Sequence, residues 1–277
     1  MWKVDRPQMS ARATYQKCVA VVRDPVLKAR LLQIEDDIAD ASDEFTVAAM
    51  ATMLSTLPAA THVRGVTAAE LTDIYTIRFA KLRSVGRPMY DQLLLAPVHA
   101  RCPLCGHRLV TTLDHHLPKS RFPALAVAPL NLVPACTDCN KIKLECVAQS
   151  RAEELLHPYF DDIETAQWLY AAVVPADPAA VVFYADPPIA WDSLLRDRII
   201  YHFDKFALAR LYAAQAAVEL QNIKFQLAGL LSEAGAAGVA AHLGDQAETR
   251  RHAYVNSWQT AFYGALAQSD WFATGGF

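Results

Sequence analysis

The amino-acid sequence predicts a mainly helical protein that carries a small α+β insertion. Three observations lead to this expectation. Apolar residues make up 53% of the 277-residue chain and include many alanines, which favour helix. Over most of the chain these apolar residues recur at helical spacing. Between about residues 98 and 150 that periodicity gives way to clustered Cys, His, Pro and Gly.

The first region, 1–97, is expected to be helical. Asp24-Pro25 is typical of a helix start, with an N-cap followed by proline at the first helical position. A second helix is expected over Glu44–Leu57, stopped by Pro58. The spacing of Thr67 and Glu70 is that of a capping box before a further helix. Behind that box we expect an apolar helix face, and we expect this helix to end at Gly86. A short helix is then expected over 88–95.

The region after the insertion, 151–277, is expected to hold a short β-hairpin and then helices. Two strand-like runs, Trp168–Val174 and Val181–Tyr184, flank a Pro-Ala-Asp-Pro turn. A long helical stretch follows from Asp192 to about Glu233. Glycines at 235, 238 and 244 are expected to break it before a last helix over 248–268, with a frayed tail.

Charge and hydropathy restrict the class of protein. No apolar run approaches the roughly 20 residues of a membrane span, and the first ten residues are too charged for a signal peptide, so we expect a cytoplasmic protein with reduced thiols. Net charge is −3, but residues 99–146 hold six Lys/Arg against three Asp/Glu, which is +3 there and −6 elsewhere. Only the central segment, 98–150, has the charge expected for contact with nucleic acid.

Four of the six cysteines form two Cys-x-x-Cys pairs, at Cys102 with Cys105 and at Cys136 with Cys139, separated by 30 residues. Four thiolates in such pairs are the usual ligands of structural zinc. The alternative, four buried cysteines without metal, is the weaker reading in a reducing compartment. The sequence therefore predicts a structural Zn²⁺ site that stabilises a segment with little core of its own.

Between the cysteine pairs the chain resembles the HNH endonuclease family over about 45 residues. The matching residues are Asp114-His115 followed by Pro118 and Ser120, Asn131-Leu132, and Cys139-Asn140 followed by Lys143. The DHHLPKS and NLVPACTDCNKIK stretches also resemble HNH proteins of bacterial anti-phage systems, some of which work beside an ATPase partner. The resemblance implies a zinc-clamped β-hairpin packed on a helix around one divalent cation.

The resemblance also implies roles for individual residues. His115 would be the general base. Asp114 would bind a catalytic Mg²⁺ or Mn²⁺, joined by Asn140 where many members place a histidine. Asn131 would hydrogen-bond across the hairpin loop and support catalysis. The adjacent His116 is expected to point to the opposite face of the strand and to serve a structural role.

Four cations near these residues are candidates for contact with the nucleic-acid backbone. Lys143 matches the family lysine, and Lys141 lies beside it. Lys119 and Arg121 are expected in the loop after the histidines. For each of them a solvated charged surface is the alternative.

The function predicted from these features is a metal-dependent endonuclease that hydrolyses phosphodiester bonds of DNA as an effector in bacterial anti-phage defence. The alternative is a zinc-stapled module that binds nucleic acid or protein without cleaving it. An RNA-processing ribbon protein is a third reading, but it leaves Asp114-His115 unexplained.

Overall fold

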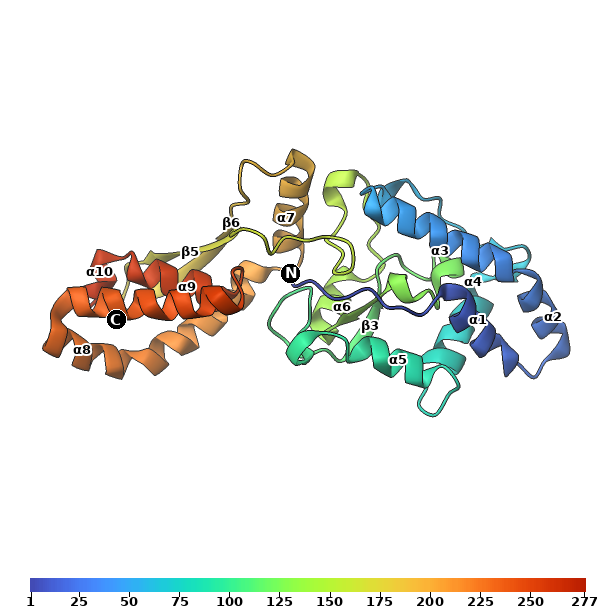
Figure 1. Ribbon diagram of the computed structural model, residues 1–277, viewed down its shortest axis with the longest axis horizontal. Coiled ribbons are helices and arrows are strands. Elements are labelled where there is room, and N and C mark those ends of the chain that lie inside the picture. Colours follow the sequence, from blue (N-terminus) through green and yellow to red (C-terminus); the bar gives the residue numbers. More distant parts are fainter. The chain divides into compact units, whose positions relative to one another are not determined.

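The computed structural model describes residues 1–277 and divides into two compact units, Met1–Asp162 and Ile163–Phe277 (Figure 1). Most of the ordered elements are helices, and the sheets are three separate antiparallel pairs of strands. The predicted mainly helical class with a small α+β part is confirmed. The sequence regions 1–97 and 98–150 both lie in the first unit.

The first unit begins with helices whose starts are capped as the sequence predicts. The Asp24 side chain accepts hydrogen bonds from two backbone N–H groups of the following turn, and Thr67 with Glu70 forms a complete capping box. The helices are α1 (Ala11–Ala20), α2 (Pro25–Gln33), α3 (Glu35–Met50), α4 (Ala68–Asp73), η2 (Ile74–Ala80) and α5 (Arg87–Leu94). A strand pair, β1 (His62–Val63) and β2 (Val66–Thr67), and short turns η1 (Leu54–Thr56), η3 (Val98–Ala100), η4 (Pro123–Leu125), η5 (Pro129–Asn131) and η6 (Arg151–Glu153) connect them.

The helix expected over Glu44–Leu57 has different bounds. It starts at Glu35 and ends at Met50, eight residues before Pro58. The end is a Schellman motif: Thr52 has a left-handed φ of 54°, its N–H donates to Ala49, and the next N–H donates to Ala48. Threonine is uncommon at the left-handed position of a Schellman motif, so the sequence did not indicate that the helix ends at Met50.

The central segment and the helices share their core. Phe122 and Leu125 pack with Phe45 of α3 in one buried cluster, and Val127 and Leu113 join a second cluster with residues of α1 to α5. Apolar residues of the central segment therefore attach it to the helical scaffold. The helices therefore hold the central segment through apolar contacts that do not involve the four cysteines.

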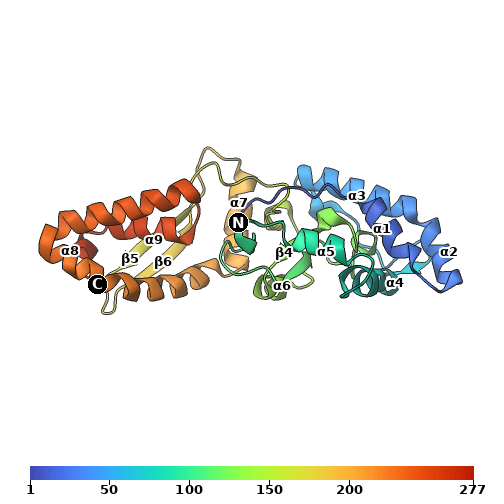
Figure 2. The ribbon, with the colours of Figure 1, turned by 60° about the horizontal axis from the view of Figure 1, so that its bottom comes forward.

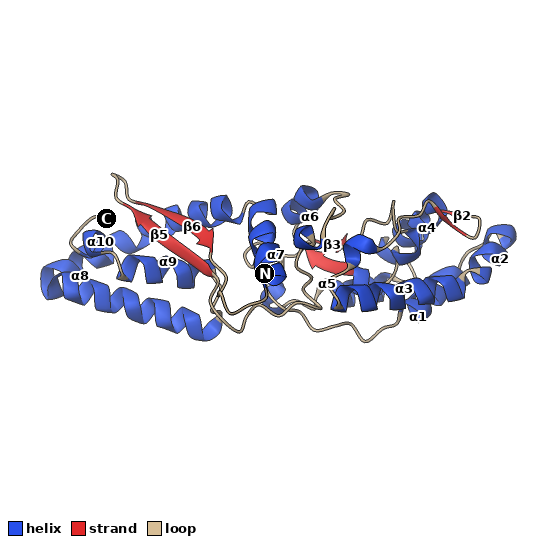
Figure 3. Ribbon diagram, turned by 90° about the horizontal axis from the view of Figure 1, so that it is seen from above, coloured by secondary structure: helices blue, strands red, loops and turns tan.

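The second unit packs a β-hairpin against helices (Figures 2 and 3). Its elements are β5 (Leu169–Val174), β6 (Ala180–Ala185), α7 (Ser193–Lys205), α8 (Leu208–Ala253), α9 (Trp258–Ala267) and α10 (Asp270–Ala273). The predicted hairpin is therefore present. None of the helices in the chain combines the length and apolarity that a membrane span needs.

The glycines of the second unit act differently from one another. Gly235 interrupts α8 with φ 67° and ψ −173°, as predicted. Gly238 and Gly244 stay helical and the helix continues to Ala253, so the predicted breaks there are wrong. The helix expected over 248–268 is instead interrupted before Ser257, because the buried Asn256 side chain bonds to backbone groups of Ile163 and Trp168.

We predict a pH-dependent contribution of Glu70 to stability. Hydrogen bonds from Arg30 and from the Thr67 N–H lower the pKa of Glu70 from 4.5 to about 2. A carboxyl whose pKa is lower in the folded state stabilises the fold above its ordinary pKa, and that contribution is lost as pH falls toward the folded value. Glu70→Gln should therefore be less stable than the wild type at pH 7, and the difference should shrink from about pH 4.5 downward.

Urea unfolding at pH 7, 5 and 4 measures this difference. A gap between wild type and Glu70→Gln that stays constant with pH would contradict the ionised pair.

Candidate functional site

A short hairpin and a helix form the central segment. Strands β3 (Thr112–His115) and β4 (Leu132–Ala135) are antiparallel, with Asp114 opposite Val133 and His115 opposite Leu132. Helix α6 (Thr137–Lys143) follows β4 directly. The first cysteine pair precedes β3 and the second lies where β4 passes into α6, so the cysteines bracket the hairpin.

The four predicted ligand cysteines come together. The sulfurs of Cys102, Cys105, Cys136 and Cys139 all lie within 4.8 Å of one another, and all four side chains are buried. Tetrahedral sulfurs about 2.3 Å from a zinc ion lie about 3.8 Å apart, so this donor set fits. The group could hold a metal ion such as zinc.

Local structure holds each cysteine pair in place. Gly106 has φ +60° directly after the first pair, and a Cβ there would meet the Trp2 indole at 2.9 Å, so glycine is required both for the turn and for the close approach. Cys136 caps α6 and accepts from the Cys139 N–H. An ion pair of 2.8 Å between Arg108 and Asp138 links the two pairs from outside.

His115 is held in one tautomer. Its Nε2 lies 2.8 Å from the Ala126 carbonyl oxygen, which can only accept, so Nε2 carries the proton and Nδ1 holds the lone pair. The ring of Tyr75 meets the His115 ring edge-on at 4.4 Å. Burial lowers the pKa of His115 to about 3, and Lys119 acts in the same direction. At neutral pH the ring is therefore uncharged.

Asp114 is buried beside a buried cation. Its carboxylate oxygens lie 3.1 and 3.4 Å from the Lys143 Nζ, which also donates to the His115 carbonyl oxygen at 2.6 Å. Burial raises the pKa of Asp114 to about 6, and Lys143 opposes that rise. The Asp114 carboxylate therefore already has the Lys143 ammonium as its ionic partner.

The position of Lys143 corrects its predicted role. A phosphate contact needs an accessible ammonium, whereas the Lys143 side chain is only 2% exposed and bonds inward to β3. The reason is that Asp114 would otherwise be a buried charge without a partner. Lys143 thus ties α6 to the strand that carries Asp114 and His115.

Asn131 makes the cross-loop hydrogen bonds expected of it. Its side-chain oxygen accepts from the Leu117 N–H at 2.7 Å, and its amide donates to the carbonyl oxygens of Leu117 and Leu125 at 3.0 and 3.3 Å. These bonds join the chain just after β3 to the chain just before β4. They fix the loop that supplies the Ala126 carbonyl to His115.

A cleft of about 540 Å³ opens over these residues. Asp114, His115 and Asn140 line it, as do Lys119 and Lys141. Arg121 is exposed but is not part of the lining. Thus the predicted metal and base residues share a cavity with two of the four predicted backbone-contacting cations.

Two features of the cleft carried no recognisable sequence signal. Tyr75, which lies against His115, is indistinguishable in sequence from the other apolar residues of its helix face. The Ala126 carbonyl is a backbone group that any residue would supply. Both arise from tertiary packing of η2 and of the loop against β3.

His116 points away from the cleft, as alternation along the strand predicts. Its ring packs against that of His157, with the ring centroids 4.3 Å apart and the planes tilted by 35°. His157 accepts from the Tyr159 N–H and contacts the Leu130 carbonyl oxygen through Nε2. The structure therefore gives His116 a packing role and leaves His115 on the cleft side.

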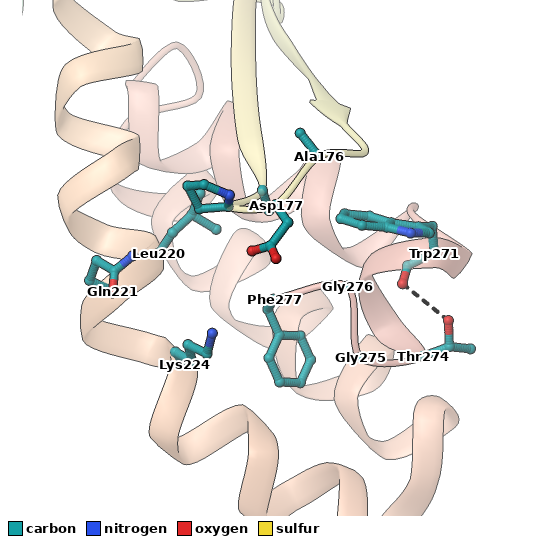
Figure 4. A pocket seen from close by; sticks show the side chains of 12 residues that line it. Ala176, Asp177, Leu220, Gln221, Lys224, Trp271, Thr274, Gly275, Gly276 and Phe277 are labelled. Atoms are coloured by element: carbon teal, nitrogen blue, oxygen red, sulfur yellow. Dashed lines mark hydrogen bonds between the residues drawn. The ribbon is translucent and has the colours of Figure 1, made fainter.

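The second unit has a separate pocket of about 570 Å³ between the β5–β6 turn and helices α8 and α10 (Figure 4). Asp177 and Lys224 are its ionisable lining side chains, and Trp271 forms one wall. It brings together no pair of carboxylates, no histidine and no cysteine. The cleft at Asp114 is therefore the better candidate for chemistry.

The comparisons with known proteins do not show the family of this chain. The chain is similar to the protein named Protein ea31 of Escherichia phage lambda, with 32% identity over 170 residues. The aligned stretch covers 60% of this chain and 57% of the phage protein, so it spans little more than half of that relative. No protein-family model matches the chain, and no solved structure matches it.

Replacing one ligand cysteine should release the metal. We expect Cys105→Ser to lose bound zinc and to unfold the central segment, because structural zinc in small sites contributes roughly 10 kcal/mol or more. Elemental analysis of the purified protein, with circular dichroism, checks this. Cys146→Ser is the matched control, since Cys146 lies outside the cluster and should leave one zinc per chain. A full zinc complement in Cys105→Ser would contradict the four-sulfur site.

Removing the Lys143 charge should destabilise the fold. Lys143→Met keeps the length of the side chain but leaves Asp114 buried without a counter-ion, which costs about 3 kcal/mol or more. Lys141→Met, two residues away and exposed, should change the free energy of unfolding by less than about 0.5 kcal/mol. Urea unfolding of the two variants compares them, and equal stabilities would show that the buried ion pair is not structural.

Proposed function

We propose that this chain is a divalent-metal-dependent endonuclease of the HNH type that hydrolyses phosphodiester bonds of DNA. One observation carries the proposal. Asp114 and His115, adjacent on β3, line the same cleft, and His115 is a neutral ring whose only unprotonated nitrogen is Nδ1. A buried carboxylate beside an oriented base is the combination that metal-assisted hydrolysis requires.

The residues of the cleft fit a hard divalent cation of modest affinity. Asp114 and Asn140 offer carboxylate and amide oxygens, which Mg²⁺ and Mn²⁺ prefer. No group of three acidic, His or Cys side chains surrounds Asp114, so substrate and water would complete the coordination. When bound, such a cation supplies charge stabilisation at the scissile phosphate and leaving oxygen.

The protein's own groups provide the proton transfer. The Ala126 carbonyl and the Tyr75 ring hold His115 so that Nδ1 can accept a proton from water. The resulting hydroxide attacks phosphorus, and His115 holds the proton as the imidazolium. The bond to the leaving oxygen breaks, and that oxygen keeps the electron pair and takes a proton from solvent water. The negative charge of the substrate phosphate favours that imidazolium and so raises the basicity of the ring in the complex.

The other groups position the substrate and the base. Lys119 and Lys141 line the cleft and would contact phosphate oxygens on either side of the scissile bond. Asn131 holds the loop that orients His115, and zinc in the four-cysteine site would fix the ends of the hairpin. A role in anti-phage defence and an ATPase partner remain predictions that rest on the sequence resemblance alone.

A second function is favoured by a specific observation. Lys143 already neutralises Asp114, and Asn140 brings no charge, so the cleft could be a former metal site in a zinc-stapled binding module. This alternative predicts nucleic-acid or protein binding without cleavage in any divalent cation.

Nicking of supercoiled plasmid tests the proposed function. The zinc-loaded protein should nick DNA with Mg²⁺ or Mn²⁺ and not in their absence. Loss of a general base typically costs about 10²–10⁴ in rate, so His115→Ala should reduce nicking by that factor. His62→Ala, an exposed histidine outside the cleft, is the matched control.

Zinc content and circular dichroism show whether His115→Ala remains folded. Wild-type nicking in a folded His115→Ala variant would remove His115 from the mechanism. No nicking by the wild type with either cation would favour the binding module.

A further inference from the structure

A group of basic residues lies on the first unit outside the cleft. They come from the end of α1, from α2, and from η2 and the loop after it, and we call them the basic surface. Its members are Lys17, Arg23, Lys28, Arg78, Lys81 and Arg83. Lys17, Arg23 and Lys28 lie at least 70 residues before the central segment, and the motif around the cysteines therefore does not include them.

Hydrogen bonds bring these elements together. The Cys18 thiol donates to the Arg78 carbonyl oxygen at 3.8 Å, which joins α1 to η2, and Lys28 Nζ donates to the Ala20 carbonyl oxygen at 2.6 Å, which joins α2 to the end of α1. Arg23 and Arg78 line one open hollow of about 720 Å³ with Ala20, the last residue of α1, and the two valines after it. The hydrogen bonds therefore place the elements that carry the basic residues side by side, and Arg23 and Arg78 meet at one hollow.

The loop after η2 is folded back tightly. The Gly86 N–H donates to the Arg78 carbonyl oxygen at 2.9 Å, and a Cβ at Gly86 would lie 2.7 Å from the Phe79 backbone. This close return requires glycine. It holds Lys81 and Arg83 near Arg78, with both side chains exposed.

The six cations differ from their neighbours in having no ionic partner. On the same and adjoining elements, Arg12, Arg30, Arg64 and Arg87 each form an ion pair with a carboxylate. No carboxylate lies within 4 Å of the basic surface residues. The nearest acidic residues in sequence are Asp24, whose side chain caps α2, the exposed Asp73, and Asp91, which pairs with Arg87, so cations are in excess.

The basic surface adjoins the cleft through a single element. Tyr75 of η2 lines the cleft, and Arg78, three residues later on η2, lines the hollow of the basic surface. A polyanion bound in the cleft would therefore extend along η2 to the basic surface. Surface cations that gather on neighbouring elements without ionic partners are the usual electrostatic footprint of nucleic-acid binding.

The local side chains favour a duplex over a single strand. Binding to unpaired bases generally uses exposed aromatic rings as stacking platforms. The aromatic residues on these elements, Tyr15, Tyr75 and Phe79, are all buried. Contact would therefore be made with the phosphate backbone and not with splayed bases.

We infer that the basic surface binds the phosphate backbone of duplex DNA and holds the duplex beside the cleft. The inference rests on the proposed function for its choice of ligand, because the cleft is where the bound strand would be cut. Each phosphate contact contributes about 0.9 to the slope of log affinity against log salt concentration. Neutralising several members should therefore reduce both the affinity and its salt dependence.

Fluorescence anisotropy with a labelled duplex, over a range of salt concentrations, tests this inference. The zinc-loaded full chain is used without added divalent cation, so that cleavage does not compete. The variant Lys17→Gln/Arg23→Gln/Lys81→Gln should bind about tenfold more weakly or worse at 0.1 M salt, and its salt slope should fall by about two to three. These three side chains are exposed, so the fold should be unaffected.

The matched control neutralises three cations of the second unit, as Lys205→Gln/Arg210→Gln/Lys224→Gln. It should retain the wild-type affinity and slope. Wild-type binding by the Lys17/Arg23/Lys81 variant would overturn the inference. So would binding of the wild type to vesicles of anionic phospholipid with none to duplex DNA.

The two proposals fail in different ways. If the wild type nicks no plasmid but the Lys17/Arg23/Lys81 variant still loses duplex binding, the basic surface stands and the nuclease proposal fails. If the wild type nicks plasmid and the variant binds duplex as the wild type does, the nuclease proposal stands and the basic surface fails.

Discussion

The close approach of four cysteine sulfurs is the constraint on which the candidate site depends. Cys102 and Cys105 stand before β3, while Cys136 and Cys139 stand at the junction of β4 and α6, and all four sulfurs lie within 4.8 Å. A short two-stranded sheet has little stability of its own. Because one cluster restrains both ends of the hairpin, the register that places Asp114 and His115 at the cleft can persist.

Within that frame, burial sets the chemistry of the two central residues. Taking His115 out of water lowers its pKa, and the Ala126 carbonyl selects the tautomer with a free Nδ1. Burial acts on Asp114 in the opposite sense and raises its pKa, so the carboxylate needs the cation that Lys143 supplies. Adjacent residues thus acquire different roles from the same apolar surroundings, as paired catalytic groups commonly do.

Local signals in the sequence predicted much of this structure. The cysteine spacing predicted the sulfur cluster, alternation separated His115 from His116, and the Thr67–Glu70 pattern predicted a helix start. These features depend on neighbouring residues or on the chemistry of one motif. Local composition therefore suffices to find them.

The errors arose where tertiary contacts override local preference. The end of α3 depends on a left-handed Thr52, and Gly238 stays helical because an isolated glycine costs only about 1 kcal/mol. The family position of Lys143 indicated a surface contact, but the buried charge of Asp114 draws it inward. Tyr75 reaches the cleft only through the packing of η2, which no spacing rule describes.

The central claim is that the fold presents His115 as a neutral base with Nδ1 free. Nitrogen NMR of the histidine side chains in the zinc-loaded protein, titrated from pH 8 to pH 5, tests this most directly. The account predicts that His115 carries its proton on Nε2 and stays neutral across this range, because burial holds its pKa well below 5. A ring protonated on Nδ1, or one that titrates near pH 6.5 like an exposed histidine, would contradict it.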